Sequence, residues 1–466
     1  TVTNVREKLD EKGKISSIKC RICANGSRLD KSLYKNSSCP TIATESLMLL
    51  FADAAAHRRE FKSVDIEGAY LECSMNEEVY MSFSGRVLVE LLILYPNMKK
   101  YLHSGVLYVK LLKALYGLPM SGYLWYQKLK SVLISLNYEM SNKDDCVFIN
   151  KRDPNKIKKA GIHGDDILVI CDNIDLVNEE CERIGSNFTN YKVSDHNNFK
   201  HLGMVISRNE NRDIDINMSK YILDIVKEYN LDDVNKYPHD NKMFNKDSSN
   251  KVPENIRKNY HSIIYKLLFI AKRCRPDILL NVSYLSSYVN ACTYTKCKYL
   301  IKLMQYLNNS MDRGLKFIGG NSVNLQIYAD ASFMAHSDLY GRTGIIVVAS
   351  NSVIATKSSK QTLLAMSSTE AELISLYSAI RISTELRDKC ASFSIECSKP
   401  VIFQDNRNII AMLDKPKPYE LSSKHVTLKY YAVHDACKNN EVEVQWCSTE
   451  DMLADIMTKP LMGDLF

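Results

Sequence analysis

Asp165 and Asp166 are adjacent carboxylates and the first candidates for chemistry in this sequence. They follow Gly164 and precede an apolar run, within Gly161-Ile-His-Gly-Asp-Asp-Ile-Leu-Val-Ile170. This pattern predicts two apolar strands joined by a tight glycine turn, with both acids at the tip. Because turns favour Asp for structural reasons, the pair alone is more typical of a solvated turn than of a catalytic site.

A third acid, Asp65, makes a catalytic interpretation stronger. It stands near the end of the alternating segment 61–66, far from the pair in sequence, where the pattern predicts a strand entering a turn. A strand and a hairpin could therefore bring the three carboxylates to one divalent ion. Oxygen ligands of this kind suit Mg²⁺, and two such ions about 4 Å apart can activate a primer 3′-hydroxyl and stabilise a leaving pyrophosphate.

The C-terminal part holds a second set of acids. Alternating segments predict strands at 324–330, 344–349, 353–356, 401–406 and 442–447, and helices follow the third, fourth and fifth of these strands. The acids that could converge over one sheet edge are Asp330, Glu370, Asp405 and Asp455. Glu370 has a structural alternative, because its spacing from Ser367 is that of a helix capping box.

Length and composition set the wider limits. The chain has 466 residues, which predicts two to four domains at roughly 100 to 200 residues each. Its net charge of +7 permits a nucleic-acid partner without requiring one. No run approaches the ~18 apolar residues of a membrane span, and the N-terminus is no signal peptide. The 14 cysteines show no complete zinc pattern and indicate a reducing compartment.

Several motifs resemble the reverse transcriptases of Ty1/copia-type LTR retrotransposons, which are encoded within a Pol polyprotein. The matching segments are Val64-Asp65-Ile66 through Tyr70-Leu71, Leu112 to Leu118 with Trp125-Tyr126, and His163-Gly-Asp-Asp166. The segments around the second set of acids, from Tyr-Ala-Asp-Ala-Ser to Ala-Asp-Ile-Met-Thr-Lys-Pro-Leu, resemble the ribonuclease H of the same elements. The order strand-strand-strand-helix-strand-helix-strand-helix also resembles ribonuclease H.

The resemblance implies an α/β (α+β) chain with a right-hand polymerase, a helical connection and a ribonuclease H-like mixed-sheet domain. We expect fingers and palm over 1–235, the thumb or connection region over 236–320 and the ribonuclease H domain over 321–466. Both ends are expected to be cut from a longer reading frame. The implied activities are RNA- and DNA-templated DNA synthesis and cleavage of the RNA strand of a hybrid.

The resemblance also assigns residue roles. Asp65 and Asp166 would be the main polymerase metal ligands, with Asp165 supporting them, and Asp330, Glu370, Asp405 and Asp455 would hold the ions of the second site. Lys19 and Arg21 would contact the triphosphate, Tyr70 would act against a ribose 2′-hydroxyl, Gly117 would frame the nascent base pair, and His425 beside Lys424 would assist product release. From the residues alone, a solvated strand face for Lys19 and Arg21 and a core aromatic for Tyr70 remain the alternatives.

The implied cofactor is Mg²⁺, with Mn²⁺ as an alternative. The implied partners are an RNA template, a DNA primer, an RNA–DNA hybrid and dNTPs, together with the integrase, protease and capsid of the same element, and no membrane. The implied location is the cytoplasm, in a virus-like particle, with the nucleus as an alternative.

Three departures from the family pattern favour another interpretation. They are Asn25 in place of a lysine, Pro119-Met120 in place of Lys-Gln, and His163-Gly164 in place of Tyr-Val. An inactive or domesticated relic that binds nucleic acid without polymerising is therefore the alternative. A chain that keeps only the nuclease is a third interpretation.

Overall fold

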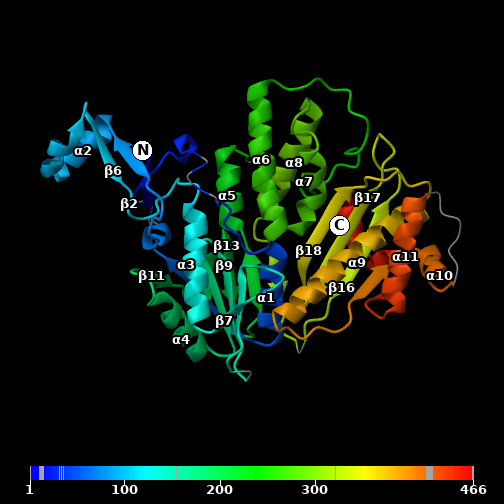
Figure 1. Ribbon diagram of the computed structural model, residues 1–466. Helices are drawn as coiled ribbons and strands as arrows, with labels where there is room; N and C mark the ends of the chain where they lie inside the picture. The colour runs from blue at the N-terminus through cyan, green and yellow to red at the C-terminus, as the bar shows by residue number, and fades with distance from the viewer. Residues whose placement is uncertain are drawn as a thin grey trace.

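The centre of the molecule is a six-stranded antiparallel sheet. The structure is a computed structural model that describes residues 2–9, 15–30, 32, 34, 36–153, 155–231, 233–320, 322–415, 423–463 and 466. In sheet order the strands are β11 (Tyr191–Val193), β3 (Glu60–Ile66), β10 (Asp166–Cys171), β9 (Lys158–His163), β8 (Val147–Asn150) and β7 (Tyr138–Met140). The helices α3 (Ser121–Ser135) and α4 (Ile174–Gly185) lie beside it (Figure 1).

Helix α1 (Thr44–Ala56) is buried along most of its length, from Ser46 to Ala56. A helix that is apolar on all sides must lie between layers rather than on a surface. One side contacts the central sheet, where Leu50 approaches Gly161 of β9 closely enough that a Cβ there would meet its side chain. The other side contacts a strand of the C-terminal sheet, described below.

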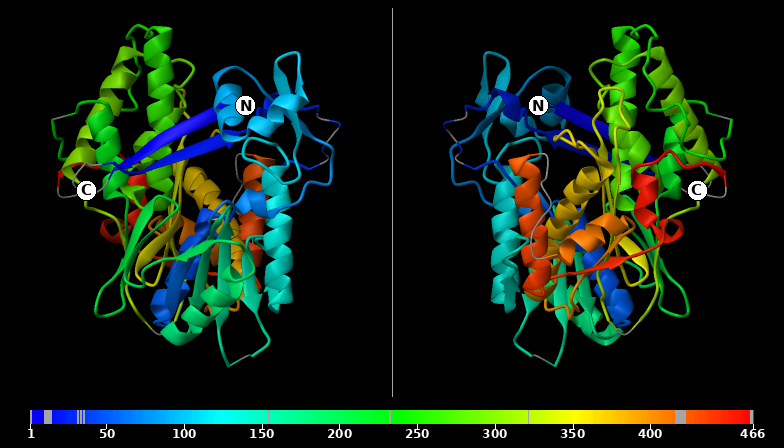
Figure 2. Two further views of the ribbon diagram at one scale, coloured as in Figure 1. Left: turned by 90° about the vertical axis from the view of Figure 1, so that its left-hand side faces the viewer. Right: turned by 90° about the vertical axis from the view of Figure 1, so that its right-hand side faces the viewer.

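The N-terminal region is a hairpin and a small sheet with a hydrophobic cluster of their own. The hairpin consists of β1 (Val2–Leu9) and β2 (Ile15–Cys23). The small sheet has the order β4 (Tyr80–Phe83), β6 (Val106–Lys110) and β5 (Leu102–His103), with α2 (Gly85–Leu94) against it. The hairpin lies above the central sheet in both views of Figure 2.

A four-stranded antiparallel sheet follows the central one. Its strands are β12 (Asn198–His201), β13 (Met204–Arg208), β14 (Ile214–Asn217) and β15 (Leu315–Phe317). Between the last two strands the chain forms α5 (Ser219–Glu228), α6 (Glu254–Arg273), α7 (Leu279–Ser286) and α8 (Tyr294–Asn309). The helical region is thus an excursion from this sheet, and residues near 315 return to pair with residues near 215.

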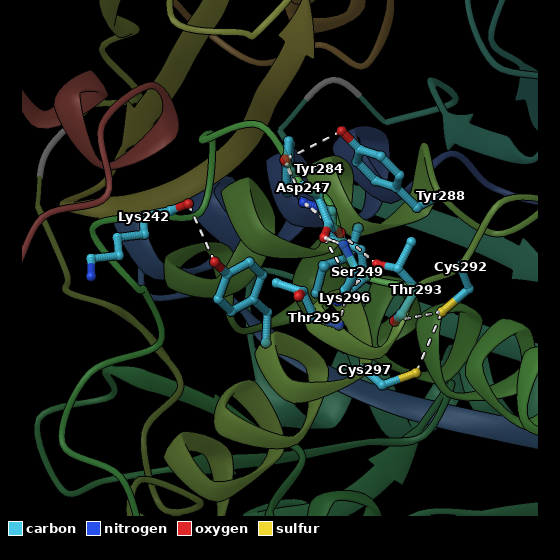
Figure 3. A network of polar contacts seen from close by, with 12 residues as sticks. Lys242, Asp247, Ser249, Tyr284, Tyr288, Cys292, Thr293, Thr295, Lys296 and Cys297 are labelled. Carbon is cyan, nitrogen blue, oxygen red and sulfur yellow. Dashed lines mark hydrogen bonds and ion pairs between the residues drawn. The ribbon is translucent and has the colours of Figure 1, made fainter. Parts of the chain in front are cut away.

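The polar segment before α6 is held by side-chain contacts with α7 and α8 (Figure 3). The Nζ of Lys296, a residue that is 1% exposed, donates to the hydroxyl of Tyr284 at 2.9 Å and lies 3.9 Å from Asp247. The ammonium also lies 4.6 Å from the ring centroid of Tyr288. Asp247 accepts a hydrogen bond from the hydroxyl of Thr293, the N-cap residue of α8. A buried ammonium is tolerated here because a carboxylate and aromatic faces compensate its lost hydration.

The C-terminal region is a five-stranded mixed sheet. In sheet order its strands are β18 (Ser352–Lys360), β17 (Arg342–Ala349), β16 (Gln326–Ser332), β19 (Val401–Gln404) and β20 (Glu443–Trp446). The first three are antiparallel, and β19 runs parallel to both of its neighbours. Its helices are α9 (Ser368–Ser392), α10 (Arg407–Leu413) and α11 (Lys424–Lys438). The predicted class of mixed helix and sheet is confirmed.

Two details of this region differ from the sequence prediction. Two helices, α10 and α11, lie between β19 and β20 where one was predicted. The segment predicted as a final helix forms two short 3-10 turns, η6 (Thr449–Asp451) and η7 (Leu453–Met457). The prediction missed the break because residues 451–460 are compatible with helix by composition, whereas their hydrogen bonds close shorter turns.

The two large sheets are joined through α1 and the C-terminal end of α9. On the central side, Lys159 of β9 is fully buried, lies 2.8 Å from Asp53 of α1, and donates to the carbonyl of Ser394 just after α9 at 3.2 Å. Lys143 pairs with Asp388 of α9 at 2.7 Å. No helix within the described residues is both long enough and apolar enough to cross a bilayer.

Candidate active sites

The predicted hairpin of the central sheet is formed by β9 and β10. His163 pairs with Asp166, which leaves Gly164 and Asp165 as a two-residue loop. Gly164 has φ +64°, while Asp165 is not left-handed, which is the pattern of a type II′ turn. The carbonyl of Gly164 accepts a hydrogen bond of 2.7 Å from the indole of Trp125 in α3. The loop that carries the two acids is therefore fixed from the helix side.

The sheet register brings the third acid to this loop. Asp65 of β3 lies directly opposite Asp166 of β10, so their Cβ atoms are about 4.5–5.5 Å apart on one face. The backbone N–H of Ile66 donates to the carbonyl of Asp165 at 3.3 Å. Residues far apart in sequence, Asp65 and the Asp165-Asp166 pair, thus converge at this loop.

The neighbouring carboxylates affect the protonation of Asp166. Burial raises the pKa of Asp166 to about 6, and the charges of Asp165 and Asp65 add to this effect. Three acids at this separation repel one another when all are ionised. A divalent cation with oxygen ligands would relieve that repulsion, so the donor set fits Mg²⁺.

Two tyrosines and an arginine border these acids. The rings of Tyr70 and Tyr116 lie with centroids 4.6 Å apart, and the guanidinium of Arg21 lies 5.1 Å from the centroid of Tyr116. Burial raises the pKa of both tyrosine hydroxyls, and Asp165 adds to the shift in each case. Tyr70 is half-buried rather than a core aromatic.

Gly117 is the point where the N-terminal hairpin approaches the loop before α3. Its φ is +91°, and a Cβ at this position would overlap the carbonyl oxygen of Ala24. The N–H of Ala24 donates to the carbonyl of Tyr116 at 2.8 Å. Lys19 lies two residues before Arg21 on the backbone of β2, and its side chain lies outside the described residues. The hairpin is therefore fixed beside the acids by a contact that only glycine permits.

The second set of acids gathers at one end of the C-terminal sheet. Asp330 lies on β16, and Asp405 follows β19, the parallel neighbour of β16. Glu372 lies in the second turn of α9. The carboxylates of Asp330, Glu372 and Asp405 each offer an oxygen, and these atoms lie within 4.8 Å of one another.

The prediction for Glu370 requires a correction. Its Oε2 accepts a hydrogen bond of 2.9 Å from the backbone N–H of Met366, and its own N–H donates to the hydroxyl of Ser367. This is a capping-box arrangement in which the Glu370 side chain reaches the residue just before the N-cap Ser367, so the carboxylate is directed to the helix terminus. Glu372, which the sequence analysis did not select, takes the place predicted for Glu370 in the cluster.

A helical periodicity argument could have identified Glu372. The buried face of α9 continues through residues 375, 376, 379, 383 and 386. Glu372 is at the helical spacing of i−3 and i−4 from the first two of these, so it belongs to the stripe that faces the sheet. A carboxylate within an apolar stripe is an unusual residue and indicates a site.

Asp455 lies at the edge of this cluster. It stands in η7, and Lys459 donates to its Oδ1 at 2.7 Å and to Oδ1 of Asp330 at 3.4 Å. The hydroxyl of Thr458 donates to the other oxygen of Asp330. Gly344 of β17 permits this approach, because a Cβ there would overlap Thr458, Met457 and the carbonyl of Ala454.

The predicted product-release residue, His425, lies in the first turn of α11. Its side chain is exposed, and the helix is capped by Ser423. The residues just before that cap, 416–422, lie outside the described part of the chain. Within the part described, no hydrogen bond or ion pair joins His425 to the four acids.

Burial governs the electrostatics of the second cluster. It raises the pKa of Asp330 and Glu372, and neighbouring carboxylates, Asp405 among them, add to both shifts. Burial and the charge of Asp330 raise the pKa of Asp455 to about 6. Oxygen ligands that repel one another in a partly dry site fit a hard divalent cation.

The sequence of this chain matches a family model over residues 2–240, described as reverse transcriptase (RNA-dependent DNA polymerase). This match covers the hairpin, the central sheet and both elements that carry the first set of acids. The chain belongs to this reverse transcriptase family.

The similar curated proteins are transposon polyproteins. The chain is 26% identical over 98% of its length to the Retrovirus-related Pol polyprotein from transposon RE2 of Arabidopsis thaliana, and 23% identical over 98% to that from transposon TNT 1-94 of Nicotiana tabacum. It spans 30% and 34% of these two relatives. The predicted resemblance to Pol polyproteins of Ty1/copia-type transposons is therefore confirmed.

A solved structure titled as a foamy viral protease-reverse transcriptase in complex with RNA/DNA hybrid is also similar. The likeness covers 92% of this chain and 48% of that chain, with a TM-score of 0.48 and 12% identity. A likeness at this level supports no inference about activity.

Proposed function

We propose that this chain is a retrotransposon polymerase with two active sites, one that synthesises DNA on an RNA or DNA template and one that cleaves the RNA strand of an RNA–DNA hybrid. One observation carries the proposal. Two groups of carboxylates are each assembled from residues distant in sequence, the first by the pairing of β3 with β10 and the second by β16, α9 and the end of β19. The first group lies in the segment that matches the reverse transcriptase family.

At the first site, Asp65 and Asp166 would hold two Mg²⁺ ions with support from Asp165; such ions activate a 3′-hydroxyl and stabilise a leaving pyrophosphate. Arg21, with Lys19 on the same strand, binds the triphosphate through its cationic side chain. Tyr70, whose ring packs against that of Tyr116, would contact the sugar and act against a 2′-hydroxyl. Gly117 lets the backbone approach the nascent base pair.

At the second site, Asp330, Glu372, Asp405 and Asp455 would hold the ions, with Glu372 in place of Glu370. This oxygen cluster suits the delivery of a water to a phosphodiester, and the 2′-hydroxyl and duplex shape select the RNA strand. His425 assists departure of the cleaved strand from the exposed start of α11. The partners are an RNA template, a DNA primer, dNTPs and the integrase, protease and capsid of the same element, within a virus-like particle.

Primer extension by the full chain tests the proposal. Wild type extends oligo-dT on poly-rA with Mg²⁺, whereas Asp65→Asn loses extension but still cleaves the RNA of a preformed hybrid. Asp330→Asn gives the opposite result. Intact extension by Asp65→Asn would reject the assignment of the first site.

The second candidate is an inactive relic that binds nucleic acid. The observation that favours it is the His163-Gly164 sequence at the catalytic hairpin, where His163 has a buried Nδ1 with no hydrogen-bond partner in the described residues. A folded wild-type chain that binds hybrid but neither extends nor cleaves would establish this candidate. Cleavage without extension would leave the nuclease alone.

A further inference from the structure

Lys459 places a positive charge inside the C-terminal acidic cluster. Its Nζ lies 2.7 Å from Oδ1 of Asp455 and 3.4 Å from Oδ1 of Asp330. Asp330 is 1% exposed, so its carboxylate has little solvent to screen it. Among the residues that the structure describes, Lys459 is the only cation with an ion pair to the acids of this cluster.

The cluster is divided into two parts by this lysine. Asp330, Glu372 and Asp405 offer oxygens within 4.8 Å of one another, a span that one cation can bridge. Asp455 does not belong to that group. It is joined to Asp330 through the ammonium of Lys459 instead. Asp330 therefore contributes both to the three-carboxylate group and to the ion pair with Lys459.

The position of Lys459 is fixed by the backbone. Its N–H donates to the carbonyl of Asp455 at 2.8 Å, which sets the i,i+4 pair. The preceding residue, Thr458, is 1% exposed and donates to Asp330, and both follow the turn that packs on Gly344. The backbone at Lys459 is thus fixed, and its ammonium contacts both acids.

We propose that the ammonium of Lys459 occupies the position of the second divalent cation, between Asp330 and Asp455, and that this ion binds only by displacing it. The inference rests on the proposed RNA-cleaving site and adds a mechanism that controls its loading. The first ion binds to Asp330, Glu372 and Asp405 without moving Lys459.

The charges explain why such a residue is useful. Four acids in one partly buried site repel one another, and one fixed ammonium lowers that repulsion before any metal arrives. An ammonium and a divalent cation cannot share the same pair of oxygens, because their charges repel at contact distance. The second ion therefore binds more weakly than the first, and substrate phosphate, which adds negative charge to the site, favours its binding.

Mn²⁺ binding to the metal-free full chain tests this proposal. All proteins carry Asp65→Asn and Asp166→Asn, so that the remaining binding reports the C-terminal cluster, and free Mn²⁺ is followed by electron paramagnetic resonance. Lys459→Met is expected to tighten the second Mn²⁺ by at least about fivefold while the first changes by less than about twofold. Lys459→Gln should behave in the same way, and Lys459→Arg should resemble wild type.

Lys360→Met is the matched control. Lys360 forms an ion pair with Asp338 and its side chain is 39% exposed, close to the 37% of Lys459, but it lies outside the cluster. Its removal should leave both Mn²⁺ affinities unchanged. Thermal melts with and without Mn²⁺ give a second readout, because Lys459→Met should be stabilised more by the metal than wild type is.

Asp405→Asn separates the failure of this inference from the failure of the proposed function. It should weaken the first Mn²⁺. If Asp405→Asn does so and Lys459→Met leaves the second affinity unchanged or weaker, Lys459 does not compete with the ion and the inference is wrong. If Asp405→Asn binds Mn²⁺ like wild type, the cluster is no metal site and the proposed function of this site is wrong.

Discussion

The assignment of Glu372, rather than Glu370, to the second site can be tested directly, because the two residues are close on one helix and carry the same charge. We expect Glu372→Gln to lower cleavage of the RNA strand by at least about 100-fold, equivalent to about 2.7 kcal/mol of transition-state stabilisation. Glu370→Gln should leave cleavage within about twofold, because Gln also satisfies a capping box and only a helix-terminus charge worth about 0.5 kcal/mol is lost.

In the metal-free protein, Glu372→Gln should raise the stability of the fold, although it lowers activity. Burial, Asp330 and Asp405 raise the folded-state pKa of Glu372, so the folded protein binds more protons than the unfolded chain at pH values between the two pKa values. Stability therefore falls as pH rises from about 4.5 toward the folded-state pKa, at about 1.4 kcal/mol for each unit of the shift. Glu372→Gln removes this penalty and should raise the melting temperature at pH 7 in EDTA.

The assays are hybrid cleavage with a labelled RNA strand and urea unfolding from pH 4 to 8, a range that begins near the unfolded-state pKa of a glutamate, about 4.3. Both variants are measured with EDTA and with Mg²⁺, since the ion should offset the repulsion in wild type and in Glu370→Gln but less in Glu372→Gln. Loss of cleavage in Glu370→Gln together with activity in Glu372→Gln would refute the placement of α9.

Three further predictions concern the central sheet and its contacts. Gly117→Ala should lower extension at limiting dNTP by about tenfold with little effect on hybrid cleavage, because its methyl group must displace Ala24 and the N-terminal hairpin; steady-state kinetics measure this. Lys159→Met should destabilise the chain by about 2–3 kcal/mol in urea unfolding, less than a fully orphaned charge would, because its acidic partner keeps an arginine. The Mg²⁺ affinity of the first site should fall as pH drops below about 6, because Asp166 takes up a proton there. Single-turnover extension across pH 5 to 8 measures this, and a Mg²⁺ requirement that stayed constant would contradict it.

The first set of acids was predictable because local patterns determine it. Alternating apolar residues around Asp65 and a glycine turn before Asp165 predict strand and hairpin, and the structure has both. The pairing of β3 with β10 was not predictable from the residues alone. Register between distant strands depends on tertiary packing, so the residues alone indicated only that the two segments could converge.

The second set shows where local patterns mislead. Ser367 and Glu370 satisfy a capping rule, which was the structural alternative to a metal role, and the structure shows that arrangement for Glu370. Glu372 is marked only by its helical spacing from the buried face of α9, which packs on β16. Thr458 and Lys459, which contact Asp330, lie far from it in sequence, and no periodicity links them to it.

Helix α9 connects these observations physically. Its second turn carries Glu372 into the carboxylate cluster, and its last turns contact the central sheet through Asp388 and the segment that accepts from Lys159. Lys159 belongs to β9, the strand that enters the hairpin with Asp165 and Asp166. A helix rises about 1.5 Å per residue, so the segment from 372 to 392 forms a stiff helix about 30 Å long. The distance between the two proposed active sites is therefore set by packed secondary structure rather than by a linker. The number of hybrid base pairs between the two sites should then be constant.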